Sequence, residues 1–174
     1  YLAMLGACRL GVIFCHLFSS TGFDELSLRL ANAKPRGILT HPDLLERIPS
    51  ETKEFVRHIF LTQGPVPNLF PNEIIVDDLH EQMSKTFEPV WLDNSAPLYM
   101  NSTSGSTGPP KGIVHVHNDM LGILISSRYV LDLREDTVLW TDAHPAWVTG
   151  TVYGVFGPLL CGATSLIQGD EFSA

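Results

Sequence analysis

The residues best suited to chemistry lie in a twelve-residue stretch, NSTSGSTGPPKG, at residues 101–112. It combines three glycines, five hydroxyl side chains and one lysine. Glycines let the backbone approach a ligand closely, hydroxyls donate hydrogen bonds, and a lysine supplies a point charge. Such a set is suited to phosphate groups. The candidate phosphate-binding residues are Thr103, Ser104, Gly105, Ser106, Thr107, Gly108 and Lys111.

The prolines of this stretch exclude the commonest lysine-containing phosphate loop. The Walker pattern is G-x-x-x-x-G-K-[ST], and it leads into a helix. Here Lys111 follows Pro110, and the next residues, GIVHV, have the pattern of a strand. Proline donates no N–H group and resists the coil that wraps a phosphate. We therefore expect a flap between two strands, more accessible and mobile than they are. A Ser/Gly linker is the alternative, but linkers rarely end in Pro-Lys-Gly between strands.

The elements that position this flap alternate between strand and helix, which predicts an α/β fold. The first apolar segment is typical of a helix ending near Gly11 and a buried strand from Val12 to Phe18. Further strands are predicted at 36–41, 58–62, 98–102, 112–116, 137–143 and 163–169. Further helices are predicted at 24–33, 42–48, 117–133 and, interrupted by glycines, 147–162. Residues 63–73, QGPVPNLFPNE, are typical of a loop.

Composition limits the classes of partner. The 174 residues carry a formal net charge of −8, which gives no general attraction for nucleic acid or an anionic membrane. No apolar run reaches the roughly 18 residues of a membrane span. Three cysteines without C-x-x-C spacing suit a reducing cytoplasm. The chain opens at Tyr1 in mid-pattern, so we expect a fragment of one domain. We divide it into a first α/β portion, 1–95, and a portion, 96–174, with the glycine-rich stretch.

A resemblance to a known family extends over nearly the whole chain. TSGSTGPPKG resembles the phosphate-loop signature of the adenylate-forming enzymes, which include acyl-CoA synthetases, luciferases and adenylation domains. GIVHVHNDML, the stretch 129–164 and LGACRLGVIFCHLF look like the acetyl-CoA synthetase branch. The resemblance implies a fragment of a layered αβαβα large domain. It implies that a carboxylate and ATP, with Mg²⁺, give acyl-adenylate and pyrophosphate, and that CoA then displaces AMP. Lys111 would be catalytic, with the loop holding the β- and γ-phosphates.

The same resemblance implies an acyl pocket in the stretch AWVTGT. The matching residues are Trp147, Val148 and Thr149, near the place where CoA enters. Trp147 would form a rigid wall, Val148 would limit depth, and Thr149 would offer a hydroxyl; a core aromatic is the alternative for Trp147. Selection by shape is weak, about 1–3 kcal/mol per methylene, so such a pocket favours a short acyl chain without fixing acetate as the substrate. Where related sequences tend to carry Asp or Val and then Gly, this chain has His-Pro-Ala at 144–146.

Two other functional hypotheses remain open. His115 and His117, with Asp119, could begin the divalent metal site of a hydrolase, for which only His144 and Asp142 are further candidates. The second hypothesis is a non-catalytic structural or binding remnant. The family's adenine motif, ribose-binding aspartate and mobile-domain lysine have no match in this chain, so we expect the isolated chain to be inactive.

Overall fold

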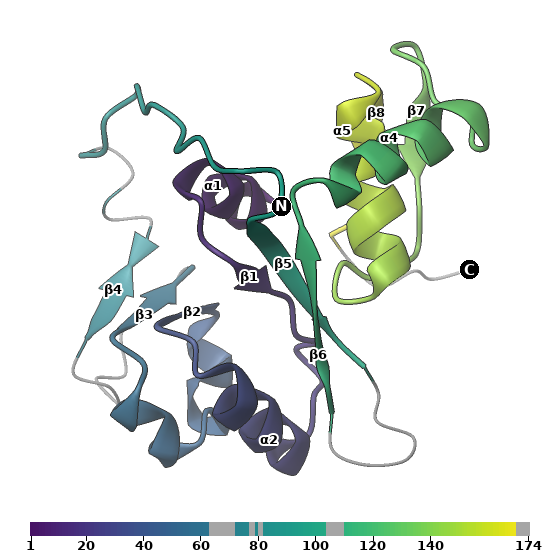
Figure 1. The fold of residues 1–174 in the computed structure, drawn as a ribbon. Helices are drawn as coiled ribbons and strands as arrows, with labels where there is room; N and C mark the ends of the chain where they lie inside the picture. Colours follow the sequence, from purple (N-terminus) through teal and green to yellow (C-terminus); the bar gives the residue numbers. More distant parts are fainter. Residues whose placement is uncertain (63–71, 77–78, 80–81, 104–109, 170–174) are drawn as a thin grey trace. The chain divides into compact units, whose positions relative to one another are not determined.

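The computed structural model describes residues 1–62, 72–76, 79, 82–103 and 110–169. They form two compact units whose segments interleave along the chain. Unit 1 comprises Tyr1–Leu17, Pro89–Asn101 and Ile113–Ala174, and unit 2 comprises Phe18–Glu88 and Ser102–Gly112. Both units combine helices with strands, so the predicted α/β class is confirmed (Figure 1). The subdivision at residue 95 stays a prediction.

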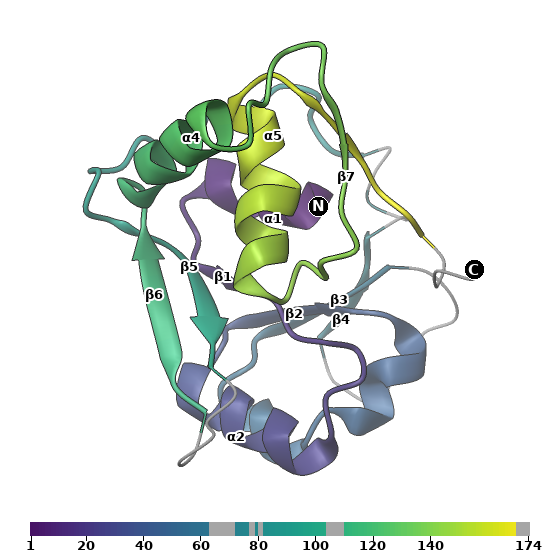
Figure 2. The ribbon, with the colours of Figure 1, turned by 90° about the vertical axis from the view of Figure 1, so that its right-hand side faces the viewer.

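Unit 1 contains a three-stranded sheet in the order β1-β5-β6, built from β1 (Phe14–Cys15), β5 (Pro97–Ser102) and β6 (Gly112–Val116). Strand β1 is parallel to β5, with Phe14 opposite Tyr99. The arrows of β5 and β6 run in opposite directions (Figure 2). The predicted strands that flank the glycine-rich stretch are therefore confirmed as the two arms of a hairpin.

Helices pack on this sheet to form the core of unit 1. They are α1 (Leu2–Leu10), α4 (Asp119–Tyr129), the π-helix η3 (Gly150–Phe156) and its continuation α5 (Gly157–Leu160). The core side chains are Met4, Leu98, Tyr99, Ile123, Val155 and Phe156. A second, parallel pair of strands, β7 (Val138–Trp140) and β8 (Thr164–Leu166), completes the unit. The glycine-interrupted helix predicted at 147–162 is thus mostly a π-helix.

The first helix ends where the sequence predicts, but the strand after it is much shorter than predicted. Gly11 has a left-handed φ of 68°, and its N–H bonds to carbonyls in the last helical turn. The N–H of Val12 bonds to Ala7 O at 3.0 Å in the same cap. It is therefore not available to a sheet, and pairing with β5 begins only at Phe14. The buried strand predicted from Val12 to Phe18 is wrong at both ends.

Unit 2 contains a parallel sheet in the order β2-β3-β4, from β2 (Gly37–Thr40), β3 (His58–Leu61) and β4 (Glu73–Ile75). Around it lie α2 (Phe23–Ala33) and two 3₁₀ helices, η1 (Pro42–Arg47) and η2 (Ser50–Glu54). Leu30, Leu45, Ile59 and Leu61 are buried there. The sequence predicts the first two strands correctly and misses the third. Most of the predicted loop 63–73 lies outside the described residues.

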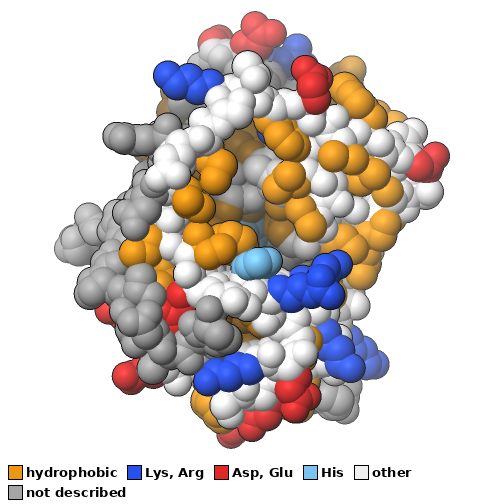
Figure 3. Space-filling view, turned by 90° about the vertical axis from the view of Figure 1, so that its left-hand side faces the viewer, with side chains coloured by type: hydrophobic (Ala, Val, Ile, Leu, Met, Phe, Trp, Pro, Cys, Tyr) orange, Lys and Arg blue, Asp and Glu red, His pale blue; other side chains and the backbone are white. Residues whose placement is uncertain are grey.

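Charged side chains are mixed on the surface. On the face shown in Figure 3, Lys and Arg side chains of the described residues lie singly or in small groups among polar and apolar ones. In the part of the chain that the structure describes, none of the helices has the length and apolar character needed to cross a bilayer.

Candidate phosphate loop and acyl pocket

The stem of the glycine-rich loop is closed by hydrogen bonds between Thr103 and Lys111. The N–H of Thr103 donates to Lys111 O at 2.9 Å, and the N–H of Lys111 donates to Thr103 Oγ1 at 3.3 Å. The threonine hydroxyl also donates to Lys111 O, at 3.3 Å. These bonds fix the backbone of Lys111 while its side chain is exposed. In this conformation the hydroxyl of Thr103 serves the stem rather than a ligand.

The remaining predicted phosphate-binding residues, Ser104, Gly105, Ser106, Thr107 and Gly108, lie outside the described residues. Their roles, and the predicted mobility of the flap, stay predictions.

Helix α2 contributes a second anchor to the stem. Asn32 Nδ2 donates to Pro110 O at 3.3 Å, immediately before Lys111. Proline cannot donate an N–H group, so the carbonyl is the backbone group through which this residue can be held. This role of Asn32 could not be found from the sequence, because the two residues are 78 positions apart and no local pattern connects them.

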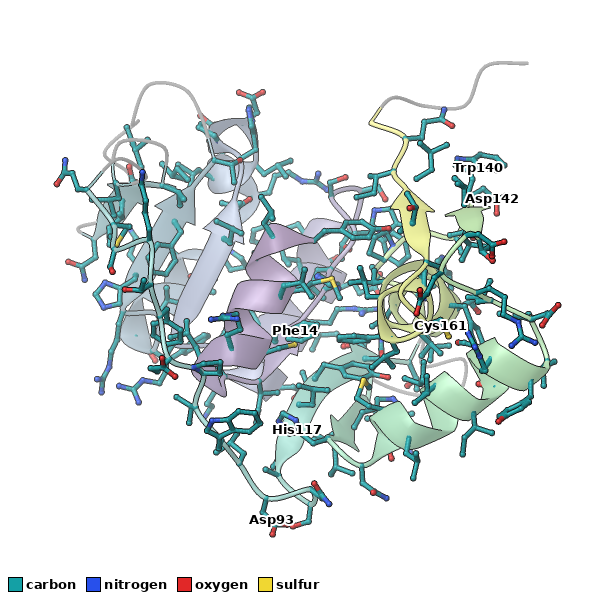
Figure 4. All side chains as sticks on the ribbon, turned by 90° about the horizontal axis from the view of Figure 1, so that it is seen from above. Phe14, Asp93, His117, Trp140, Asp142 and Cys161 are labelled. Atoms are coloured by element: carbon teal, nitrogen blue, oxygen red, sulfur yellow. The ribbon has the colours of Figure 1, made fainter. Side chains whose placement is uncertain are left out.

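The acyl-pocket candidates follow a tight turn after β7. Figure 4 shows Trp140 and Asp142 where this strand ends. The N–H of Trp147 donates to His144 O at 2.9 Å, which is the hydrogen bond of a β-turn with Pro145 in its second position. The N–H of Ala146 donates to His144 Nδ1 at 3.0 Å inside the same turn. The turn ends at Trp147 and leads into helix.

The turn is packed tightly against the start of the helix. A β-carbon at Gly150 would lie 2.1 Å from His144 O, closer than real contacts allow. The hydroxyl of Thr151 donates to Pro145 O at 2.6 Å. Beside this rigid base, Trp147 is 55% exposed and Val148 is 49% exposed. In this chain Trp147 is therefore not a core aromatic, and the predicted trio of Trp147, Val148 and Thr149 lies together on the surface of unit 1.

A histidine that no sequence motif marks, His16, lies near this turn. His16 follows β1, and its ring centroid is 5.3 Å from that of Phe14. Burial lowers the pKa of His16 to about 4, and the charge of the N-terminus lowers it further. A hydrogen bond with the backbone of Pro145 opposes the shift, and His144 adds a smaller lowering effect. The imidazole is therefore neutral at pH 7.

The shifted pKa of His16 predicts that stability falls in mild acid. The unfolded imidazole takes up a proton near pH 6.5 and the folded one only near pH 4. Above pH 6.5 the ring is neutral in both states, and its contribution to stability is complete. As the pH falls from 6.5 to 4, the unfolded state takes up the proton first, so the free energy of unfolding should fall by at most about 1.4 kcal/mol per pH unit. Urea unfolding of wild type and His16→Asn from pH 7.5 to 4.5 measures this. The two curves should diverge below pH 6.5, and parallel curves would contradict the prediction.

Of the two histidines in the HVH stretch, His115 has surroundings typical of a structural residue. His115 stacks on Tyr99 with centroids 4.4 Å apart and planes 10° apart, and Tyr99 stacks in turn on Phe14 across the sheet. His115 Nδ1 lies 3.2 Å from Asp119 Oδ2. Within the described residues, no group of three or more His, Cys, Asp or Glu side chains is arranged to hold a metal ion. The hydrolase hypothesis thus lacks a third ligand in the described part of the chain.

Comparison with known proteins identifies the family. The family model described as AMP-binding enzyme matches residues 1–173, so the chain belongs to the AMP-binding enzyme family. Acetyl-coenzyme A synthetase of Bacillus subtilis is 40% identical over 173 residues, 99% of this chain and 30% of that protein. The enzyme of the same name from Dictyostelium discoideum is 34% identical over 95% of this chain and 27% of its own length. The chain thus spans under a third of these relatives.

Solved structures agree with this assignment. The Brucella canis acyl-CoA synthetase superposes with a TM-score of 0.87 at 27% identity, covering 98% of this chain and 31% of its own. An anthranilate CoA ligase in complex with anthranoyl-AMP superposes with a TM-score of 0.86 at 24% identity, which shows the fold alone. The expected resemblance to adenylate-forming enzymes is confirmed.

Proposed function

We propose that this chain is the part of an ATP-dependent, AMP-forming short-chain acyl-CoA synthetase that carries its phosphate loop and acyl pocket. The observation that carries the proposal is the 40% identity to an acetyl-coenzyme A synthetase over 99% of the chain. The exposed trio beside the 144–147 turn and the closed stem at Lys111 support it. The parent enzyme would act in the cytoplasm on a small carboxylate.

In the first half-reaction, a carboxylate oxygen of the substrate attacks the α-phosphorus of ATP. The bond from that phosphorus to the oxygen that bridges the α- and β-phosphates breaks, and pyrophosphate leaves with the electron pair of that bond. Lys111, held at its backbone by Thr103, would place its ammonium beside the departing phosphates, where negative charge grows. The loop residues from Ser104 to Gly108 would donate to the β- and γ-phosphates and then open to release them, while Thr103 closes the stem.

ATP would bind as its Mg²⁺ complex. The described residues hold no carboxylate cluster for a metal of the protein's own. That suits Mg²⁺, which is bound largely by substrate phosphates and water.

In the second half-reaction, the CoA thiolate attacks the acyl carbonyl, and AMP leaves. Trp147 and Val148 would enclose the acyl group, and Thr149 would offer its hydroxyl to the carboxylate or thioester. A wall of this kind limits chain length by shape, so the proposed substrates are carboxylates of few carbons.

The proposal is tested by product analysis on the full-length parent with ATP, CoA and carboxylates of two to eight carbons. We expect acyl-CoA and AMP to form in equal amounts, with kcat/KM highest at two to four carbons. A preference for long-chain acids, or release of ADP instead of AMP, would refute it.

The depth of the pocket is tested by Val148→Ala. Removing two methyl groups should raise kcat/KM for butyrate relative to acetate by about tenfold, given the usual effect of one methylene on selection. Val130→Ala, at a 78% exposed position after α4, is the matched control and should leave the ratio unchanged. If Val148→Ala also leaves it unchanged, Val148 does not line the pocket.

A further inference from the structure

We infer that His144 is a positioning residue for the acyl pocket, acting as a hydrogen-bond acceptor that sets the turn before Trp147. This inference rests on the proposed function of Trp147, Val148 and Thr149. His144 itself need not touch the substrate. It would act through the backbone of the turn.

Residues 144–147 form a β-turn with His144 in the first position and Pro145 in the second. The first position of such turns favours Asp, Asn and Ser, whose side-chain oxygens accept from the N–H two residues on. His144 does the same with a nitrogen, because its Nδ1 accepts from Ala146 N–H at 3.0 Å. Nδ1 of histidine and Oδ1 of asparagine are separated from Cα by the same number of bonds. The histidine therefore plays the acceptor role in this turn that aspartate or asparagine plays in others.

The acceptor role of Nδ1 determines which tautomer the neutral ring of His144 adopts. Nδ1 can accept only when it carries no proton, so the neutral ring carries its proton on Nε2. The side chain and carbonyl of His144 together bind two successive N–H groups, those of Ala146 and Trp147. Loss of the side-chain acceptor would leave the N–H of Ala146, a residue only 9% exposed, without this partner.

The position of His144 determines the position of Trp147, because the backbone between them is held tightly against the start of the helix. Gly150 lies against His144 O so closely that no side chain fits between them. The hydroxyl of Thr151 holds Pro145 O at 2.6 Å, and its N–H holds Trp147 O at 2.9 Å. A shift of His144 would therefore displace Trp147 directly.

The test compares three variants of the full-length parent. His144→Asn and His144→Asp each place an oxygen where Nδ1 lies, whereas His144→Leu has similar bulk and no acceptor. We expect His144→Leu to raise KM for the carboxylate about tenfold, with KM for ATP changed less than twofold. The Asn and Asp variants should restore the carboxylate KM to within about threefold of wild type.

The outcomes separate the inference from the proposed function. If wild type makes no acyl-CoA, the proposed function fails. If wild type is active and His144→Leu keeps the wild-type carboxylate KM, the positioning role is overturned. It is also overturned if the Asn and Asp variants are as impaired as His144→Leu, because an acceptor is then not what the site needs. A fall in thermal stability or kcat alone, with the carboxylate KM unchanged, would likewise contradict it.

Discussion

Lys111→Ala in the full-length parent should slow adenylate formation about 30- to 1,000-fold. The ammonium group is expected to neutralise charge that grows on the departing pyrophosphate, and removal of one such electrostatic donor commonly costs about 2–4 kcal/mol in the barrier. The same charge plays no part once pyrophosphate has left. Thioester formation from supplied acyl-adenylate should therefore keep its wild-type rate. Single-turnover measurement of each half-reaction checks both statements.

The control for this variant is Lys85→Ala, which removes another exposed lysine outside the loop. It should leave both half-reactions unchanged. Equal slowing of the two half-reactions by Lys111→Ala would contradict the charge role. It would show instead that the lysine supports the hairpin stem that it shares with Thr103.

Gly150→Ala should destabilise the parent by about 3 kcal/mol and abolish most acyl-CoA formation. The added β-carbon would lie 2.1 Å from His144 O and 2.6 Å from Ala143 O. Both neighbours are backbone atoms, so the turn must move, and overpacking of this kind costs 1–3 kcal/mol or more. Urea unfolding and acyl-CoA formation measure the two effects.

Gly122→Ala provides the matched control, because Gly122 lies inside α4 and an added β-carbon meets nothing within 4 Å. Alanine in a helix interior is favoured over glycine by about 0.8–1 kcal/mol. This variant should therefore be as stable as wild type or more stable. A Gly150→Ala variant with the stability and activity of Gly122→Ala would contradict the close packing of the turn.

The features that local patterns encode could be predicted from the sequence. Glycine after an apolar helix marks the end of α1, and strand patterns on both sides of the glycine-rich stretch give the hairpin of β5 and β6. The shortness of β1 could not be predicted, because it depends on which carbonyl captures the N–H of Val12. A helix was predicted at 147–162, but its π-helical part, η3, was not. The apolar residues of so short a segment do not distinguish a π-helix from an α-helix.

The residues proposed to contact the substrate could be predicted from the sequence. The residues that hold them in place could not. Lys111 and Trp147 stand in conspicuous motifs, and their functional roles stay predictions. The contact from Asn32 to Pro110 joins distant segments, and the buried surroundings of His16 arise only on folding. The turn at His144 had a local signal that was available, because proline after a residue with a short acceptor side chain favours a β-turn.

The central claim, that the parent enzyme forms an acyl-adenylate, is tested most directly with a carboxylate labelled with ¹⁸O in both oxygens. Attack on the α-phosphorus leaves one carboxylate oxygen bonded to phosphorus, and the thiol then breaks the bond between that oxygen and carbon. Mass spectrometry of the AMP formed with CoA and a labelled two- to four-carbon acid should show one ¹⁸O in each AMP. AMP without label, or ADP as the nucleotide product, would contradict the account.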